Sequence, residues 1–106
     1  MYKIMDYEDG KLKTLFHGVN GSRTVPLDTW LQADIKEVTD GSKNSTYISG
    51  WHTLATYNEC VDYLERFTKV DNKVIVKCKV KGNTWPKTQS RANVVLSEWV
   101  YLEEIV

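Results

Sequence analysis

Hydrophobic and polar residues alternate along the segment KVIVKCKVKG, which covers residues 73–82. Valine or cysteine occupies every second position from Val74 to Val80, and lysine fills most of the positions between them. Successive side chains of a strand point to opposite faces of a sheet, so this alternation predicts a half-buried strand with a solvated lysine face. Gly82 is expected to end this strand.

A helical period replaces this alternation between residues 57 and 68. The apolar positions of the segment recur at spacings of three and four residues: Tyr57, Cys60, Val61, Leu64 and Phe67. Thr56 followed by Glu59 forms a capping box, which satisfies the free amides at a helix start. The pattern therefore predicts one amphipathic helix at about 57–68. Its apolar side should pack on the sheet through Cys60, Val61, Leu64 and Phe67.

Turn-forming residues divide the rest of the chain into strands and loops. The Asp9–Gly10 pair tolerates the positive φ angles of a tight turn, so it predicts a hairpin between residues 2–7 and 11–17. Residues 39–46 should form another turn region. Further strands are predicted at 30–38 and, as one or two strands, at 94–106, with long loops at 17–30 and 83–93.

Together these patterns predict the α+β class: a single small domain over residues 1–106, with a twisted, mainly antiparallel sheet and one principal helix. The formal net charge is zero, because 14 basic and 14 acidic side chains cancel. This balance argues against a protein that binds long nucleic acid over its whole surface. A local basic patch remains compatible with it.

Several classes of protein are disfavoured by the sequence. No apolar run approaches the roughly 20 residues that span a bilayer, and the N-terminus lacks the basic start and apolar stretch of an export signal. We therefore expect a cytoplasmic protein that does not bind membranes. Cys60 and Cys78 suit small buried hydrophobic positions better than a disulfide. We expect no metal ion and no cofactor, and homo-oligomerisation through strand edges remains open.

The segment SGWH, Ser49–His52, stands where a strand should lead into the predicted helix. Gly50 would let a ligand approach the backbone, Trp51 could stack on a ring, and His52 could orient a ligand or act as a general acid or base. The same residues could instead form a packed corner, with the indole of Trp51 directed into the core. The sequence is compatible with both interpretations.

Basic side chains beside hydroxyl groups occur in both predicted long loops. Arg23 follows Ser22 in the first loop, and the second contains Lys87, Ser90 and Arg91. Such groups suit a phosphate or carboxylate ligand, since a guanidinium can bind it in a bidentate fork. The predicted ligand-binding set joins these loops to the SGWH corner: Arg23, Tyr47, Trp51, His52, Lys87, Ser90 and Arg91.

Several motifs resemble those of small uncharacterised proteins from bacteriophages and prophages. They are GSR at 21–23, YISGWH at 47–52, YLERF at 63–67, VIVKCKVKG at 74–82 and KTQSR at 87–91, together with Trp30. The resemblance covers most of the chain. It implies a small phage accessory protein, in a group where some members are expected to counter host defence, and it implies no established activity.

A fainter similarity is to the split β fold of the ADP-ribosyltransferase type. In that fold an early strand ends in His or Arg, a central strand carries Ser or Tyr, and a late strand supplies Glu. The segments LFHG, YISG and LSEW occur here in that order. The similarity implies an enzyme acting on a nucleotide, with His52 or His17 as acid or base and Glu98 or Glu103 as its partner. The chain lacks the Glu-x-Glu motif of the fold.

Three functions follow, and the sequence favours binding over catalysis. The first is a small phage-type accessory protein that binds an anionic, nucleotide-like ligand through the predicted set. The second is an inhibitor that covers a host defence enzyme through a surface patch anchored by aromatic residues such as Trp30, Trp85 and Trp99. The third is the nucleotide-acting enzyme.

Overall fold

The computed structural model describes residues 1–15, 24–35, 37–40, 45–67, 71–87 and 92–106. The chain is mostly strand, with a single helix among the described residues. In chain order the elements are β1 (Tyr2–Glu8), β2 (Lys11–Lys13), β3 (Trp30–Gln32), β4 (Glu37–Asp40), β5 (Ser45–Ile48), β6 (Trp51–Thr53), α1 (Tyr57–Leu64), β7 (Lys73–Pro86) and β8 (Val95–Ile105). The predicted antiparallel sheet with one principal helix is confirmed, although the balance of strand to helix exceeds that of a typical α+β protein.

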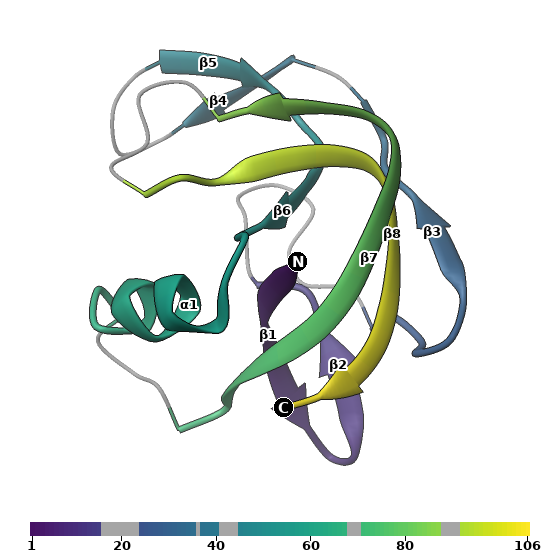
Figure 1. Ribbon diagram of the computed structural model, residues 1–106, viewed down its shortest axis with the longest axis vertical. Coiled ribbons are helices and arrows are strands. Elements are labelled where there is room, and N and C mark those ends of the chain that lie inside the picture. The colour runs from purple at the N-terminus through teal and green to yellow at the C-terminus, as the bar shows by residue number, and fades with distance from the viewer. Residues whose placement is uncertain (16–23, 36, 41–44, 68–70, 88–91) are drawn as a thin grey trace.

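Strands β7 and β8 form the long curved pair at the centre of the sheet (Figure 1). The sheet order is β2-β1-β7-β8-β3, and β6 also pairs with β8. Strand β8 thus has β7 on one side, and on the other side β6 along its first residues and β3 along its later ones. Every strand pairing described in the structure is antiparallel.

The curled sheet closes on itself near the start of the chain. The N–H of Tyr2 donates to the carbonyl of Leu54 at 2.7 Å, and the N–H of Leu54 donates to the carbonyl of Tyr2 at 2.7 Å. Leu54 directly follows β6, which pairs with β8. Strands β1, β7, β8 and β6 therefore form a closed ring.

Two hydrophobic clusters make up the core, and on strands β1 and β7 they lie on opposite faces of the sheet. Ile4 and Ile75 belong to the cluster that contacts helix α1, whereas the next residues, Met5 and Val76, belong to the other cluster. This division follows from the alternation of side chains along a strand. We call the first the helix-side cluster and the second the inner cluster.

The predicted hairpin is confirmed at β1 and β2. Asp9 and Gly10 have φ angles of 53° and 74°, as a tight turn of this kind requires. Strand β2 ends at Lys13, earlier than the predicted strand, and residues 16–17 lie outside the described residues. Residues 30–38 form two short pieces instead of the one predicted strand, because β3 pairs with β8 while β4 pairs with β5.

Helix α1 begins where the capping box predicts but ends earlier. The N–H of Glu59 donates to Oγ1 of Thr56 at 3.1 Å, and Oε2 of Glu59 accepts from the N–H of Ala55 at 3.2 Å. After Leu64 the chain continues in tighter turns, so the predicted extension to residue 68 is wrong over 65–67.

The packing side of the helix also needs one correction. Cys60 is fully buried in the helix-side cluster, and Leu64 and Phe67 pack against it as predicted. Val61 is 39% exposed and lies outside the cluster, while Tyr63 packs there instead. Cys60 and Leu64 lie within about 40° of each other around the helix axis, whereas Val61 lies about 100° from Cys60 and so falls beside the buried stripe.

The lysine-rich strand is longer than its sequence predicts. The alternation is confirmed over residues 76–80, whereas Ile75 is buried and the side chain of Lys73 is only 16% exposed. Gly82 does not end the strand, and β7 continues to Pro86. Gly82 has a φ angle of 76° and lies in a β-bulge between Lys81 and Thr84, where the N–H of Asn83 donates to Oε2 of Glu98 at 3.2 Å. Glycine tolerates this conformation, so the ladder bends and continues.

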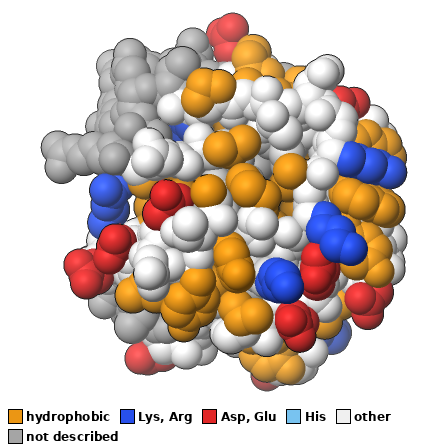
Figure 2. All heavy atoms as spheres, viewed as in Figure 1, with side chains coloured by type: hydrophobic (Ala, Val, Ile, Leu, Met, Phe, Trp, Pro, Cys, Tyr) orange, Lys and Arg blue, Asp and Glu red, His pale blue; other side chains and the backbone are white. Residues whose placement is uncertain are grey.

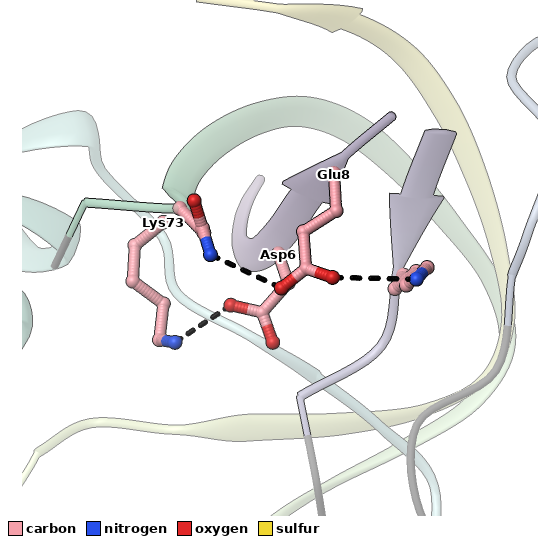
Figure 3. Close-up of polar contacts among 5 residues, drawn as sticks. Asp6, Glu8 and Lys73 are labelled. Atoms are coloured by element: carbon pink, nitrogen blue, oxygen red, sulfur yellow. Dashed lines mark hydrogen bonds and ion pairs between the residues drawn. The ribbon is translucent and has the colours of Figure 1, made fainter. Parts of the chain in front are cut away.

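A polar network joins β1 to the start of β7 (Figure 3). Nζ of Lys73 lies 2.6 Å from Oδ1 of Asp6, and both side chains are less than one-fifth exposed. Nδ2 of Asn72 donates to Glu8 at 3.1 Å, and Glu8 also contacts Lys13 at 3.4 Å. These contacts fix the end of the β1–β7 ladder.

Among the residues that the structure describes, no helix has the length and the apolar character needed to span a membrane.

Candidate binding surface

The SGWH corner packs into the protein, so the core interpretation of Trp51 replaces the ligand-stacking one. Trp51 is only 6% exposed and belongs to the inner cluster. Its indole N–H donates to the carbonyl of Leu31 at 3.0 Å. A ring enclosed in this way offers no face to a ligand.

Gly50 is required by close packing against β8. A Cβ atom at this position would lie 3.0 Å from the carbonyl oxygen of Ser97 and 3.1 Å from Cζ2 of Trp85. On either side of the glycine, Ser49 Oγ donates to the carbonyl of Asp34 at 2.6 Å and Thr53 Oγ1 donates to the carbonyl of Val95 at 2.8 Å. The hydroxyl groups of Ser49 and Thr53 therefore bind neighbouring backbone.

His52 is half-buried in β6, opposite Leu96. Its carbonyl oxygen accepts a hydrogen bond from Nζ of Lys3 at 3.0 Å. Lys3 itself is buried, 5.6 Å from the ring centre of Trp51. Burial lowers the pKa of Lys3 to about 8, and the neighbouring thiols of Cys78 and Cys60 oppose this shift.

The rest of the predicted set is not brought together by the described residues. Arg23, Ser90 and Arg91 lie outside those residues, and the side chain of Tyr47 is likewise not described, although its backbone pairs with Val38 in the β4–β5 ladder. Lys87 is half-buried just after β7, and its N–H donates to the carbonyl of Val94 at 3.0 Å. The pocket predicted from the sequence remains a prediction at these positions.

A different group of residues meets on β3, β8 and β7. Its members share one face of the sheet and are cross-strand neighbours: Trp30, Tyr101, Trp99, Lys79 and Lys81. Tyr101 pairs with Trp30 on one side and Lys79 on the other, and Trp99 pairs with Lys81. We call this group the aromatic–lysine face.

The side chains of this face are in mutual contact. Nζ of Lys81 lies 4.3 Å from the ring centre of Trp30 and 4.9 Å from that of Trp99. The rings of Trp30 and Tyr101 lie 5.4 Å apart at an interplanar angle of 57°. Contacts between an ammonium group and an aromatic ring within about 6 Å are attractive, so Lys81 holds the two indoles in place.

The face reaches solvent and carries exposed cations. Lys79 is 66% exposed at its side chain, lies 6.0 Å from the ring centre of Tyr101 and forms a 3.9 Å ion pair with Glu103. Lys81 and, farther along the same strand, Lys77 are also exposed. In Figure 2 the right-hand side, where Figure 1 places β3, β7 and β8, shows hydrophobic side chains together with basic and acidic ones.

Parts of this face were visible in the sequence. The sequence indicates Trp30 and Trp99 as anchors, and the alternation predicts the lysine row, but only the strand register joins them. Trp85, the third anchor, lies elsewhere. It packs against the helix-side cluster, and its indole N–H donates to the carbonyl of Ile48 at 3.1 Å.

Groups needed for metal binding do not gather in the part of the chain that the structure describes. No three His, Cys, Asp or Glu side chains lie close enough there to hold a metal ion. The two late glutamates of the enzyme interpretation serve other contacts, since Glu98 accepts from the Asn83 N–H and Glu103 pairs with Lys79.

Comparisons with protein-family models, with curated proteins and with solved structures found no match to this chain.

Proposed function

We propose that this protein binds an anionic ligand that carries an aromatic ring, and that the ligand lies on the aromatic–lysine face. The observation that supports this proposal is the placement of Lys81 between two tryptophan rings beside a tyrosine and a second lysine. The proposal keeps the nucleotide-like ligand class expected from the sequence. It moves the site from the SGWH corner, whose glycine and indole serve packing, to β3, β8 and β7.

The chemistry of the face suits both parts of such a ligand. A base stacked on an aromatic side chain gains about 1–3 kcal/mol. An exposed lysine contributes a compact positive charge with three donors, which can meet a phosphate from several directions. In a phage accessory protein, binding of this kind would sequester a nucleotide signal of the host.

The proposal can be tested by titrating the protein with adenosine monophosphate and following tryptophan fluorescence and isothermal heat. Trp99→Ala and Lys81→Met should each weaken binding by at least about fivefold, the loss of roughly one charged hydrogen bond or one stacked ring. Tyr57→Ala on helix α1 and Lys11→Met on β2 are matched controls, because both side chains are exposed away from the face.

Equal weakening by the controls, or no saturable binding at millimolar nucleotide, would contradict the proposal. Each variant is first checked by circular dichroism, so that lost binding is not confused with lost folding.

A second function is favoured by one specific observation. Trp30 and Trp99, two of the three anchors expected of an inhibitor of a host enzyme, share the aromatic–lysine face. Aromatic residues of this kind dominate the binding energy of protein interfaces. Lysine, however, is depleted in the desolvated centres of such interfaces, and here Lys81 occupies the centre. The small anionic ligand therefore explains more of the surface than a protein partner does.

A further inference from the structure

We infer that the ligand of the aromatic–lysine face is a short stretch of single-stranded nucleic acid rather than a mononucleotide. This inference rests on the proposed function and assigns its ligand class. A mononucleotide needs one ring and one cation, whereas the face offers three rings and a row of three exposed lysines. The number and arrangement of these groups match a ligand that repeats.

The rings and the cations lie in two neighbouring rows. Trp99 and Tyr101 lie two residues apart on β8, and same-face neighbours along a strand are about 6.8 Å apart. Lys79 and Lys81 lie directly opposite them on β7. Lys77 lies two residues before Lys79 on the same strand, beyond a shift in register and opposite Glu104. Single strands are bound by stacking platforms beside a positively charged track, because bases and phosphates alternate along the backbone.

Charge complementarity favours an anionic strand over a protein partner. Nζ of Lys81 contacts the two indoles, and no ion pair to Lys77 or Lys81 is found among the described residues. Lys79 is held only by a long, exposed contact to Glu103 at 3.9 Å, which a phosphate can replace at little cost. A protein interface would have to desolvate these lysines at its centre, whereas phosphates neutralise them while water remains nearby.

The same geometry disfavours double-stranded nucleic acid. The rings are half-buried in the sheet and packed side by side, so they cannot enter a base-paired stack. Half-buried rings at a surface instead accept unstacked bases that lie outside a duplex. The zero net charge is also compatible with this ligand, because three lysines on one face need only a few phosphates.

The test uses the intact chain and three probes. The first is a fluorescein-labelled hexathymidylate, and the second is a hairpin in which the same six thymidylates pair with six adenylates. The third is thymidine monophosphate, which is added as a competitor. Fluorescence anisotropy is recorded over a range of sodium chloride concentrations. The single strand should bind at least about tenfold more tightly than the mononucleotide, because it engages more than one ring. The logarithm of its affinity should fall with the logarithm of salt with a slope of about −2, since each neutralised phosphate of a single strand contributes roughly −0.7.

Variants separate the two rows. Lys77→Met should make the salt slope less steep by about 0.7, while Trp99→Ala should weaken binding and leave the slope nearly unchanged. Tyr57→Ala again serves as the aromatic control. Lys77→Met changes an exposed residue, so its slope remains informative even if Trp99→Ala folds poorly.

The outcomes distinguish this inference from the proposed function. If the mononucleotide binds as tightly as the hexamer, the inference is wrong and the proposed function stands. If the duplex binds as tightly as the single strand, the rings are not used and the inference is wrong. If no probe binds, both fail and a protein partner becomes the better explanation of the face.

Discussion

The SGWH corner packs closely against β8 because Gly50 has no side chain. Gly50 lies so close to the β8 backbone that the carbonyl oxygen of Ser97 occupies the space next to a Cβ atom. Backbone in the centre of a sheet cannot move without disturbing its hydrogen bonds on both sides. At the residue scale, this corner behaves as a fixed part of the core.

Gly50→Ala should therefore lower the free energy of unfolding by about 1–3 kcal/mol, the usual range for overpacking a tight site. Urea denaturation followed by circular dichroism measures this change. Asn58→Ala on the exposed side of helix α1 is the control and should stay within about 0.5 kcal/mol of the original chain. If Gly50→Ala is as stable as the control, the corner has free space and the binding interpretation returns.

Three buried titratable groups should give the protein a stability maximum near pH 9. Burial lowers the pKa of Lys3 to about 8 and raises the pKa of Cys60 and of Cys78 to about 11. Between pH 8 and 10.5 the unfolded chain binds more protons at Lys3, so stability rises with pH. Between pH 9 and 11 the folded chain keeps the thiol protons that the unfolded chain loses, so stability falls.

The rising limb should disappear in Lys3→Met. At pH 7 this variant should be more stable than the original chain by up to roughly 3 kcal/mol, since one pKa unit corresponds to about 1.4 kcal/mol. The lost hydrogen bond to the His52 carbonyl reduces the gain by about 1 kcal/mol. Lys11→Met is the control. Urea midpoints measured from pH 7 to 10 test this expectation. If the midpoint changes with pH in the same way for Lys3→Met and for the original chain, the expectation is wrong.

At the scale of single elements, helix α1 is attached to the sheet by a narrow stripe. Cys60 is fully buried, Leu64 and Phe67 pack against the helix-side cluster, and Val61 faces solvent although the same period includes it. The difference arises because successive residues of a helix lie about 100° apart around its axis, so Val61 falls to the side of the stripe that Cys60 and Leu64 form.

Leu64→Ala should lower the free energy of unfolding by about 2–3 kcal/mol, toward the low end for a leucine truncation because the side chain is only partly buried. Val61→Ala changes an aliphatic residue on the same helix and should stay within about 0.5 kcal/mol. Thermal and urea unfolding measure both. Equal losses would show that Val61 also faces the sheet.

The elements differ in how far their sequence predicts them. The start of helix α1 is predictable because Thr56 and Glu59 specify a cap through local hydrogen bonds. The length of β7 is not, because Gly82 looks like a strand end in isolation. The strand continues because β7 pairs with β8 again from Thr84 to Pro86, and the Asn83 N–H donates to Glu98 within the bulge.

At the scale of the whole molecule, the two hydrophobic clusters share their strands. Adjacent residues of β1 and of β7 enter different clusters, so neither cluster can form without the strand that the other also needs. Shared strands make the two clusters one cooperative unit.

Unfolding in urea should therefore be a single transition. Tryptophan fluorescence reports on the inner cluster through Trp51, and far-ultraviolet circular dichroism reports on secondary structure. The two signals should give the same urea midpoint. As a control, the helix-side variant Leu64→Ala should shift both signals equally. Separate midpoints would show that the clusters unfold independently.

The aromatic–lysine face also depends on the fold of the whole molecule. The sequence indicates aromatic anchors and a lysine row, but residues 30, 79, 81, 99 and 101 become neighbours only through the pairing of β3, β8 and β7. Register between distant strands is set by the whole core, so local patterns do not specify it. For the same reason Trp85, similar in sequence context, lies in the helix-side cluster.

The position of β8 in the chain has a consequence for synthesis. The strand that β3, β6 and β7 all need as a neighbour comes after each of them in the chain. While a ribosome makes the chain, those three segments emerge with no common partner and expose their apolar sides. Strands β2, β1 and β7 can pair with one another earlier, but β3 and β6 can join the sheet only once residues 95–105 have left the exit tunnel. Until then the apolar sides and unpaired edges of these strands are exposed, which is the condition under which folding chains aggregate.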